Sequence, residues 1–193
     1  ATSMDEFQAA HEENLGIPWV NTISTSAEGR AWYIDSTPTP NLSEASIAAW
    51  EQRLADGDFF TEGFDSIGTV CLEGNTTRDD WVDEAGAREP GLVPWSKLPQ
   101  LERKDYVFNA NDSHWMSHHE ELLEGYSPMH GREGTARSVR TRMNAVTLSE
   151  GSAGYAGEDG KFDIEELRDA VQEARRAGRP MEMVAGEGFT EMV

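Results

Sequence analysis

Four histidines and two neighbouring carboxylates lie close together in the sequence and could hold a metal ion. The histidines are His114, His118, His119 and His130. His114 and His118 would be one turn apart in a helix, and Glu120 or Glu121 could add the carboxylate that many zinc sites contain. The stretch has no HExxH pattern, in which two helical histidines bind zinc beside a catalytic glutamate. The residue types therefore permit zinc, but their spacing does not favour it.

Two asparagines and three arginines flank this histidine-rich stretch. The asparagines are Asn109 and Asn111, and the arginines are Arg137, Arg140 and Arg142. An amide side chain donates hydrogen bonds without titrating near neutral pH, which suits a catalytic donor. Asn111 could equally be a turn residue whose side chain caps its own backbone. The arginines, taken alone, are explained as solvated charges that neutralise an acidic surface.

The overall charge limits which partners the chain can have. The 193 residues include 36 acidic and 16 basic side chains, which gives a net charge of -20. Phosphate binding needs a concentrated basic face, so the charge argues against nucleic acid, and it also argues against anionic membranes. No apolar run is long enough to span a bilayer. Cys71 is the only cysteine, which excludes an internal disulfide, and its apolar surroundings predict a buried, inert thiol.

Capping and periodicity predict the elements that must position these residues. We expect helices from Met4 to Leu15, after Ser43, from Arg137 to about Thr147, and after Asp163. A β-hairpin is predicted from strands at residues 19–23 and 31–35, and a short strand at residues 106–108 leads into Asn109. Residues 58–104 are predicted to be mostly loop. Helices and a hairpin without regular βαβ alternation indicate an α+β fold.

Three stretches, in order, resemble the penicillin acylase family of N-terminal-nucleophile hydrolases. The first is Gly-Ile-Pro-Trp-Val-Asn-Thr-Ile at residues 16–23 with Glu-Gly-Arg-Ala-Trp-Tyr at 28–33. The second is Val-Phe-Asn-Ala-Asn-Asp-Ser-His-Trp at 107–115. The third joins residues 123–128 to 135–142. The resemblance covers residues 4–180 and is greatest to the branch of aculeacin A acylase and the acyl-homoserine lactone acylases.

The resemblance implies roles for particular residues of this chain. Enzymes of this family cleave amides with an N-terminal serine, and an asparagine after a strand helps to form the oxyanion hole. Asn111 matches that asparagine. Arg137 matches an arginine that organises the active site, with Arg140 as the alternative. Trp115 could line an acyl pocket or simply pack under the loop. Family members hold a structural calcium, for which Glu120 or Glu121 would be the ligands here.

The same resemblance implies that this chain is an internal segment of a longer enzyme. Residues 1–193 would form a single partial domain within the β subunit, part of a four-layer αββα sandwich. The chain opens with Ala1, and Ser3 is better explained as a helix cap, so the nucleophile is expected in another segment and the chain alone should be inactive. Its partners would be the acylase α chain, the rest of the β chain and a small acyl amide, in the periplasm or outside the cell.

The implied substrates are acyl-homoserine lactones, lipopeptides or β-lactam side-chain amides, and no cofactor is required for hydrolysis. A hypothesis of another class is a non-enzymatic acidic domain that binds a protein partner or a cation. An upstream reading frame that encodes a serine processing site would favour the acylase, and a natural start near Ala1 would favour the binding domain.

Overall fold

The computed structural model of the chain describes residues 1–15, 17–149 and 162–169. The helices are Met4–Glu13 (α1), Glu44–Ala55 (α2), Phe59–Asp65 (α3) and Val139–Ser149 (α4), and residues 164–169 are also helical. The strands are Thr22–Thr25 (β1), Ala31–Ile34 (β2) and Gln100–Arg103 (β3), and short 3-10 helices lie at Thr77–Asp79, Trp95–Lys97 and Pro128–His130. This mixture agrees with the predicted α+β class. None of the helices in these ranges is long and apolar enough to cross a membrane.

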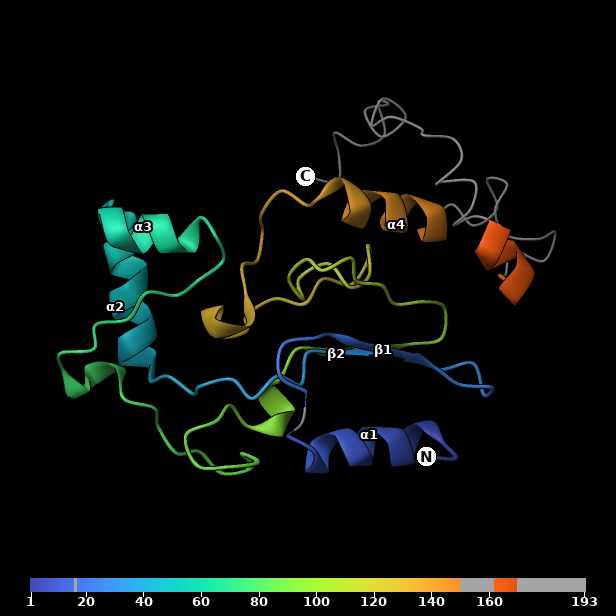
Figure 1. The fold of residues 1–193 in the computed structure, drawn as a ribbon, viewed down its shortest axis with the longest axis horizontal. Helices are drawn as coiled ribbons and strands as arrows, with labels where there is room; N and C mark the ends of the chain where they lie inside the picture. Colours follow the sequence, from blue (N-terminus) through green and yellow to red (C-terminus); the bar gives the residue numbers. More distant parts are fainter. Residues whose placement is uncertain (16, 150–161, 170–193) are drawn as a thin grey trace.

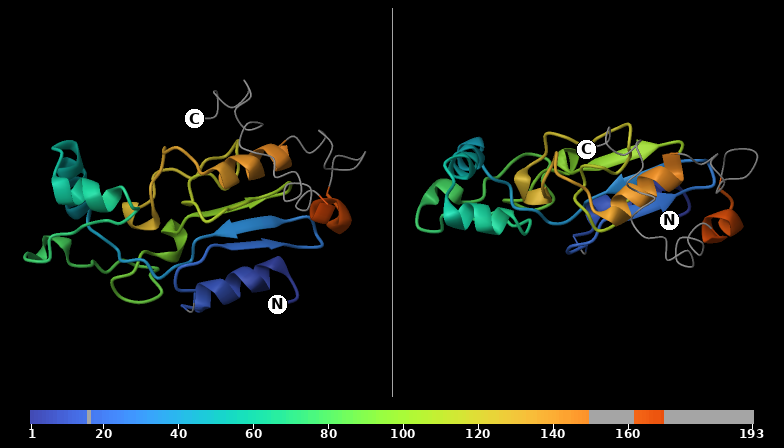
Figure 2. Two further views of the ribbon diagram at one scale, coloured as in Figure 1. Left: turned by 45° about the horizontal axis from the view of Figure 1, so that its top comes forward. Right: turned by 90° about the horizontal axis from the view of Figure 1, so that it is seen from above.

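The three strands form one antiparallel sheet in the order β1-β2-β3 (Figures 1 and 2). β2 is central, and its residue Tyr33 pairs with Ile23 of β1 and with Leu101 of β3. All four residues of β2 are buried. The register places β1 and β3, which are far apart in the chain, on either side of the same central strand. β3 leads directly toward the loop that contains Asn109 and Asn111.

The two faces of β2 pack against different elements, because successive strand residues point to opposite sides. Trp32 and Ile34 pack with Met4 of α1, which covers one face of the sheet (Figure 1). Ala31 and Tyr33 belong to a second cluster, in which the partners from the rest of the chain are Leu101, Val107 and Leu123. The segment that contains the asparagines therefore lies on the face opposite α1.

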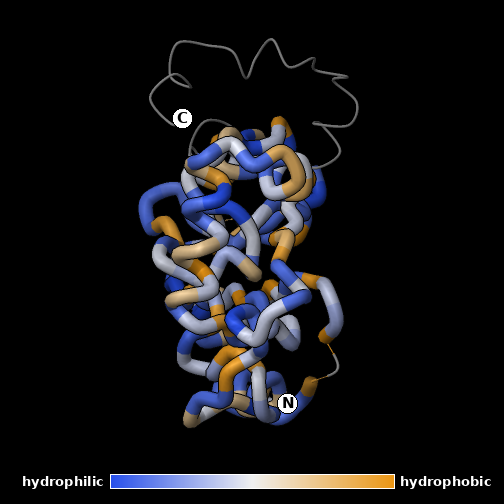
Figure 3. Tube along the Cα trace, turned by 90° about the vertical axis from the view of Figure 1, so that its left-hand side faces the viewer, coloured by the Kyte–Doolittle hydropathy of each residue, from blue (hydrophilic) through white to orange (hydrophobic). Residues whose placement is uncertain are grey.

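α4 packs on the outer side of that segment. Its residue Ala145 is fully buried against Phe108 and Met116. In Figure 1, α1, the sheet, residues 106–130 and α4 follow one another from bottom to top. Hydrophobic and hydrophilic segments alternate along the trace in Figure 3. The buried hydrophobic residues of the described part of the chain form several small clusters.

Local capping confirms several predicted helix starts. The Ser3 hydroxyl accepts a hydrogen bond from the Glu6 amide at the start of α1, and the Ser43 hydroxyl does the same for α2. Asp163 and Glu166 exchange the two hydrogen bonds of a capping box. The predicted end of that last helix, at residues 178–180, lies outside the described residues.

Other predictions were wrong, and each error has a physical reason. Residues 106–108 are not a strand, because their backbone pairs with no neighbouring strand; the Phe108 amide donates to the Ser117 carbonyl at 2.9 Å. Val107 and Phe108 are buried by side-chain packing instead. The third strand is β3, within the region predicted to be mostly loop, which also contains α3. Cys71 is half-buried instead of buried.

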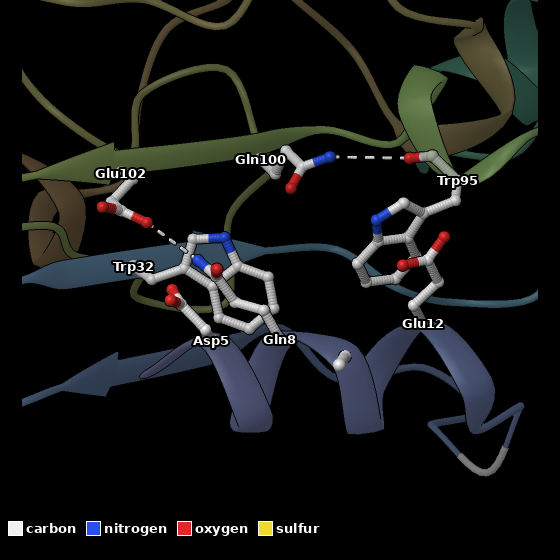
Figure 4. Close-up of a pocket in the computed structure, with 8 residues that line it drawn as sticks. Asp5, Gln8, Glu12, Trp32, Trp95, Gln100 and Glu102 are labelled. Carbon is white, nitrogen blue, oxygen red and sulfur yellow. Dashed lines mark hydrogen bonds between the residues drawn. The ribbon is translucent and has the colours of Figure 1, made fainter. Parts of the chain in front are cut away.

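Between α1 and the sheet, the packing leaves a cleft of about 520 Å³ (Figure 4). Acidic side chains, amide side chains and two tryptophans line it; the lining residues are Asp5, Gln8, Ala9, Glu12, Trp32, Trp95, Gln100 and Glu102. The Gln8 amide donates to the Glu102 carboxylate at 2.8 Å across the cleft. This hydrogen bond ties α1 to β3 and thereby fixes the helix that covers one face of the sheet.

Candidate active site

The loop at residues 109–113 holds Asn111 in an uncommon backbone conformation. Its φ is 60°, and no other non-glycine residue in the described part of the chain has a positive φ. Asparagine adopts this left-handed region more readily than most residues. The Asn111 amide donates to Oδ1 of Asn109 at 2.8 Å, and Nδ2 of Asn109 donates to the Asp112 carbonyl at 3.0 Å. Asn109 is therefore the side chain that caps the turn, which leaves the side chain of Asn111 for another contact.

Arg140 makes that contact. Its Nη1 donates to Oδ1 of Asn111 at 3.2 Å. Arg140 is the second residue of α4, so the start of this helix lies across the loop from Asn111. Within the described residues, Nδ2 of Asn111 has no hydrogen-bond partner, and both side chains are exposed. An amide held by its oxygen in this way presents its two N–H bonds to an outside acceptor.

Asp112 connects the loop to the start of α4. Its Oδ2 accepts from the Ser138 amide and the Thr141 hydroxyl, both at 3.0 Å, and its Oδ1 accepts from the Ser113 amide at 3.1 Å. A carboxylate at a helix N-terminus satisfies amides that have no partner within the helix. Burial raises the pKa of Asp112, but the hydrogen bonds from Ser138 and Thr141 outweigh it, and the pKa is lowered. Asp112 therefore stays ionised and holds the loop that carries Asn111 next to the start of α4, which carries Arg140.

Arg137 supports the loop without touching Asn111. Its side chain is only 3% exposed and forms an ion pair with Asp112 at 3.3 Å. It also donates to the Ser113 hydroxyl at 2.9 Å and to the Thr135 carbonyl at 2.7 Å. Burial lowers the pKa of Arg137, and the Asp112 carboxylate opposes that shift. Of the two arginines considered from sequence, the structure thus brings Arg140 to Asn111 and places Arg137 beneath the same loop.

Trp115 forms the platform under Arg137. The guanidinium carbon lies 4.7 Å from the centre of the indole ring, a cation–π contact. The indole N–H donates to the Glu124 carboxylate at 3.1 Å, and the ring packs against the cluster around Phe108. In these contacts Trp115 packs under the loop, which is one of the two roles considered for it from sequence.

The histidines have separate partners. His114 lies 3.1 Å from Glu133, and His118 lies 3.3 Å from Asp105. His119 contacts the Tyr106 hydroxyl, and His130 contacts Thr39 at 3.4 Å. Burial lowers the pKa of His114 and of His118. Among the described residues, no three His, Cys, Asp or Glu side chains could hold a metal ion together, so the geometry gives zinc no support.

Glu120 and Glu121, the predicted calcium ligands, lie beside the guanidinium of Arg103. The carboxylate of Glu121 is paired with Nη1 of Arg103 at 2.7 Å, and Glu120 lies 3.9 Å from Nη2 of the same guanidinium. Arg103 also binds Asp105, so one guanidinium is shared among three neighbouring carboxylates. A calcium ion here would have to displace or lie against that guanidinium, and like charges repel.

These contacts define what the site can do chemically. A fixed amide donor on an exposed loop, with a cation behind its oxygen, can stabilise a negative charge that develops on a substrate oxygen. Comparison with known proteins gives this arrangement its context. The family model for penicillin amidase matches residues 1–182. The chain belongs to the penicillin amidase family.

Individual relatives agree with the family match. The acyl-homoserine lactone acylase PvdQ of Pseudomonas syringae pv. syringae is 33% identical over 173 residues, which cover 90% of this chain and 20% of that protein. The aculeacin-A acylase of Actinoplanes utahensis is 32% identical over 161 residues, or 83% of this chain and 20% of that protein. The chain thus spans about a fifth of the length of these curated relatives. Homology supports an acylase-type amidohydrolase at the level of the family.

Asn109 and Asp112 support the site through contacts that the sequence did not indicate for either residue. Asp112 directly follows Asn111, but its four hydrogen-bond donors include Ser138 and Thr141, which lie 26 and 29 residues further along the chain. Capping by a side chain so distant leaves no local sequence signal. The Asx turn made by Asn109 is local, and the Asn-x-Asn spacing could have indicated it.

Proposed function

We propose that this chain is an internal segment of the β subunit of an amidohydrolase that cleaves the bond between an acyl chain and an amine. In that enzyme it supplies Asn111 to the oxyanion hole, and the N-terminal serine nucleophile belongs to another segment. The observation that carries the proposal is the Asn111–Arg140 contact, which fixes the amide oxygen and leaves the N–H bonds outward. Family membership supplies the reaction class.

The proposed chemistry assigns a task to each of four side chains at the site. Attack by the serine on the amide carbonyl produces a tetrahedral oxyanion, to which Nδ2 of Asn111 donates a hydrogen bond. Arg140 holds the amide by its oxygen and polarises it, which makes its N–H bonds stronger donors. Asp112 and Arg137 maintain the loop. Because the donor is fixed before the reaction, it needs no reorganisation in the transition state.

Exposed apolar side chains support a role as a segment of a larger protein. Trp19 is 81% exposed, Phe59 80% and Ile67 74%. Phe59 shares the short helix α3 with Phe60 and Phe64, which are also exposed, and such a group of apolar side chains is typical of a surface that contacts other protein. In the intact enzyme these positions would contact the α chain and the rest of the β chain within the four-layer αββα sandwich. By itself the chain would be inactive, because the proposed nucleophile belongs to another segment.

The proposed substrates follow the named relatives. One is named for acyl-homoserine lactones and another for aculeacin A, so we propose an acyl-homoserine lactone or a lipopeptide as substrate, with β-lactam side-chain amides as a third class. The proposed location of the enzyme is the periplasm or the cell exterior.

The first test is genetic and the second is chemical. The reading frame upstream of Ala1 should encode a serine that follows a glycine and precedes an asparagine. The full precursor should then divide into two chains and release free amine from an acyl amide, measured with an amine-reactive fluorophore. A frame that starts near Ala1, or a processed protein that releases no amine from any of the three substrate classes, would leave the acidic binding domain as the better account.

A further inference from the structure

The hairpin motif that led to the family resemblance contains two polar side chains to which the proposed function assigns no task. Asn21 lies directly before β1 and Tyr33 lies in the middle of β2. Tyr33 is completely buried although it carries a hydroxyl group. A buried hydroxyl needs a hydrogen-bond partner, and the identity of that partner shows what the group does.

A chain of hydrogen bonds leads from Tyr33 to the backbone of Asn111. The Tyr33 hydroxyl donates to Oδ1 of Asn21 at 2.7 Å, and Nδ2 of Asn21 donates to Oδ1 of Asn109 at 3.2 Å. The same Oδ1 of Asn109 accepts from the Asn111 amide at 2.8 Å. Because Oδ1 of Asn109 accepts, Asn21 presents Nδ2 to it and Oδ1 to the Tyr33 hydroxyl, so the hydroxyl donates. Burial and the nearby Asp35 raise the pKa of Tyr33, which keeps that hydroxyl protonated.

These bonds also fix the orientation of both amide groups. Nδ2 of Asn109 faces the Asp112 carbonyl, which only accepts, so Oδ1 must face the Asn111 amide. Asn21 is oriented in turn by Oδ1 of Asn109, which only accepts and therefore must face Nδ2 of Asn21. A flip of Asn109 would place its Nδ2 against the Asn111 N–H, and a flip of Asn21 would place its Oδ1 against Oδ1 of Asn109. The sheet, a rigid element, thus dictates the direction of the Asn111 N–H bond and with it the positive φ of that residue.

We infer that Tyr33, Asn21 and Asn109 are positioning residues for the oxyanion-hole asparagine, and that the hairpin motif holds the active-site loop in its left-handed conformation. This inference rests on the proposed function. Asn21 and Tyr33 are distant from the loop in the sequence, and hydrogen bonds connect them to it. They would act on the reacting centre without contact with the substrate. Catalysis through a preorganised donor is sensitive to the contacts that hold the donor, because a small rotation of the donor weakens its bond to the oxyanion.

The test uses Tyr33→Phe and Asn21→Ala in the full-length, processed enzyme, with kcat expressed per titrated active site. Each change should lower kcat about tenfold, the worth of roughly one hydrogen bond, while KM stays within twofold. We call the chain of hydrogen bonds through Tyr33, Asn21 and Asn109 the relay. Tyr106→Phe is the matched control, because it also removes a tyrosine hydroxyl, but one that contacts His119 and takes no part in the relay. That control should keep the wild-type kcat.

A double-mutant cycle separates positioning from general destabilisation. In an Asn111→Ala background, Tyr33→Phe should cause no further loss of kcat, because the relay acts only through Asn111. A tenfold loss that persists in this background would overturn the inference, as would a wild-type kcat in both Tyr33→Phe and Asn21→Ala. If the wild-type enzyme itself releases no amine, the proposed function fails and the relay loses its catalytic role with it. An active wild type with unaffected variants refutes the relay alone.

Discussion

Replacement of Arg140 by alanine tests which arginine organises the active site. The change removes the 3.2 Å hydrogen bond from the guanidinium to Oδ1 of Asn111. A hydrogen bond with one charged partner contributes about 1.5–3 kcal/mol, and the exposure of both side chains places this one near the lower limit. We therefore expect a loss of about 1.5 kcal/mol of transition-state stabilisation, or roughly a tenfold lower kcat, with little change in KM.

Arg137→Ala provides the comparison. This side chain is 3% exposed and is paired with Asp112, whose own side chain is 24% exposed. Breaking a buried pair costs about 3–5 kcal/mol, and the partial exposure of Asp112 reduces that to roughly 2–3 kcal/mol. We expect faster thermal inactivation of the full-length enzyme as the main effect, since Arg137 also loses its contact with Trp115.

Both variants are measured by amine release from an acyl amide, with active sites counted by titration and heat resistance followed as residual activity. Arg140→Lys should recover part of the activity because it restores the charge without the planar guanidinium. The reasoning is refuted if Arg137→Ala lowers kcat per active site more than Arg140→Ala does, or if Arg140→Ala stays within twofold of the wild type.

Two further predictions concern Asp112 and His114. Asp112→Ala should lower kcat about tenfold and also shorten the thermal half-life, since the carboxylate both aligns Asn111 and caps α4; a variant that loses only heat resistance would contradict the alignment role. The pKa of His114 is lowered in the folded protein, so below about pH 6.5 the unfolded state takes up a proton that the folded state does not, and stability falls as the pH falls. His114→Gln can keep a donor facing Glu133 and should flatten thermal inactivation rates measured between about pH 5 and 7, whereas an unchanged slope would assign the acid sensitivity to other groups.

The parts of the fold that could be predicted from sequence are those decided by neighbours in the chain. The helix starts at Ser3 and Ser43 depend on contacts three residues away, and the structure confirms them. β3 could not be recognised because Gln-Leu-Glu-Arg is polar, and it is a strand only because β2 pairs with it. Residues 106–108 have strand-like composition, yet their burial comes from packing against Met116, Leu123 and α4.

The candidate site shows the same division. Asn111 could be proposed from sequence because the motif around it is contiguous. The sequence favoured Arg137 over Arg140, whereas the residue that contacts Asn111 is Arg140. This contact depends on where α4 lies relative to the loop, and that placement follows from the distant contacts of Asp112. The Tyr33–Asn21–Asn109 relay was equally inaccessible, since its members converge only when β2 and the loop share one face of the sheet.

The most direct test of the central claim is kcat for acyl amide hydrolysis by the full-length enzyme and its Asn111→Ala variant. The loss of one oxyanion-hole donor typically costs about 2.7–4 kcal/mol. We therefore predict that kcat falls by roughly 10²–10³ while KM and division into two chains stay close to the wild type. An Asn111→Ala enzyme that is correctly processed and retains kcat within a few-fold of the wild type would contradict the account.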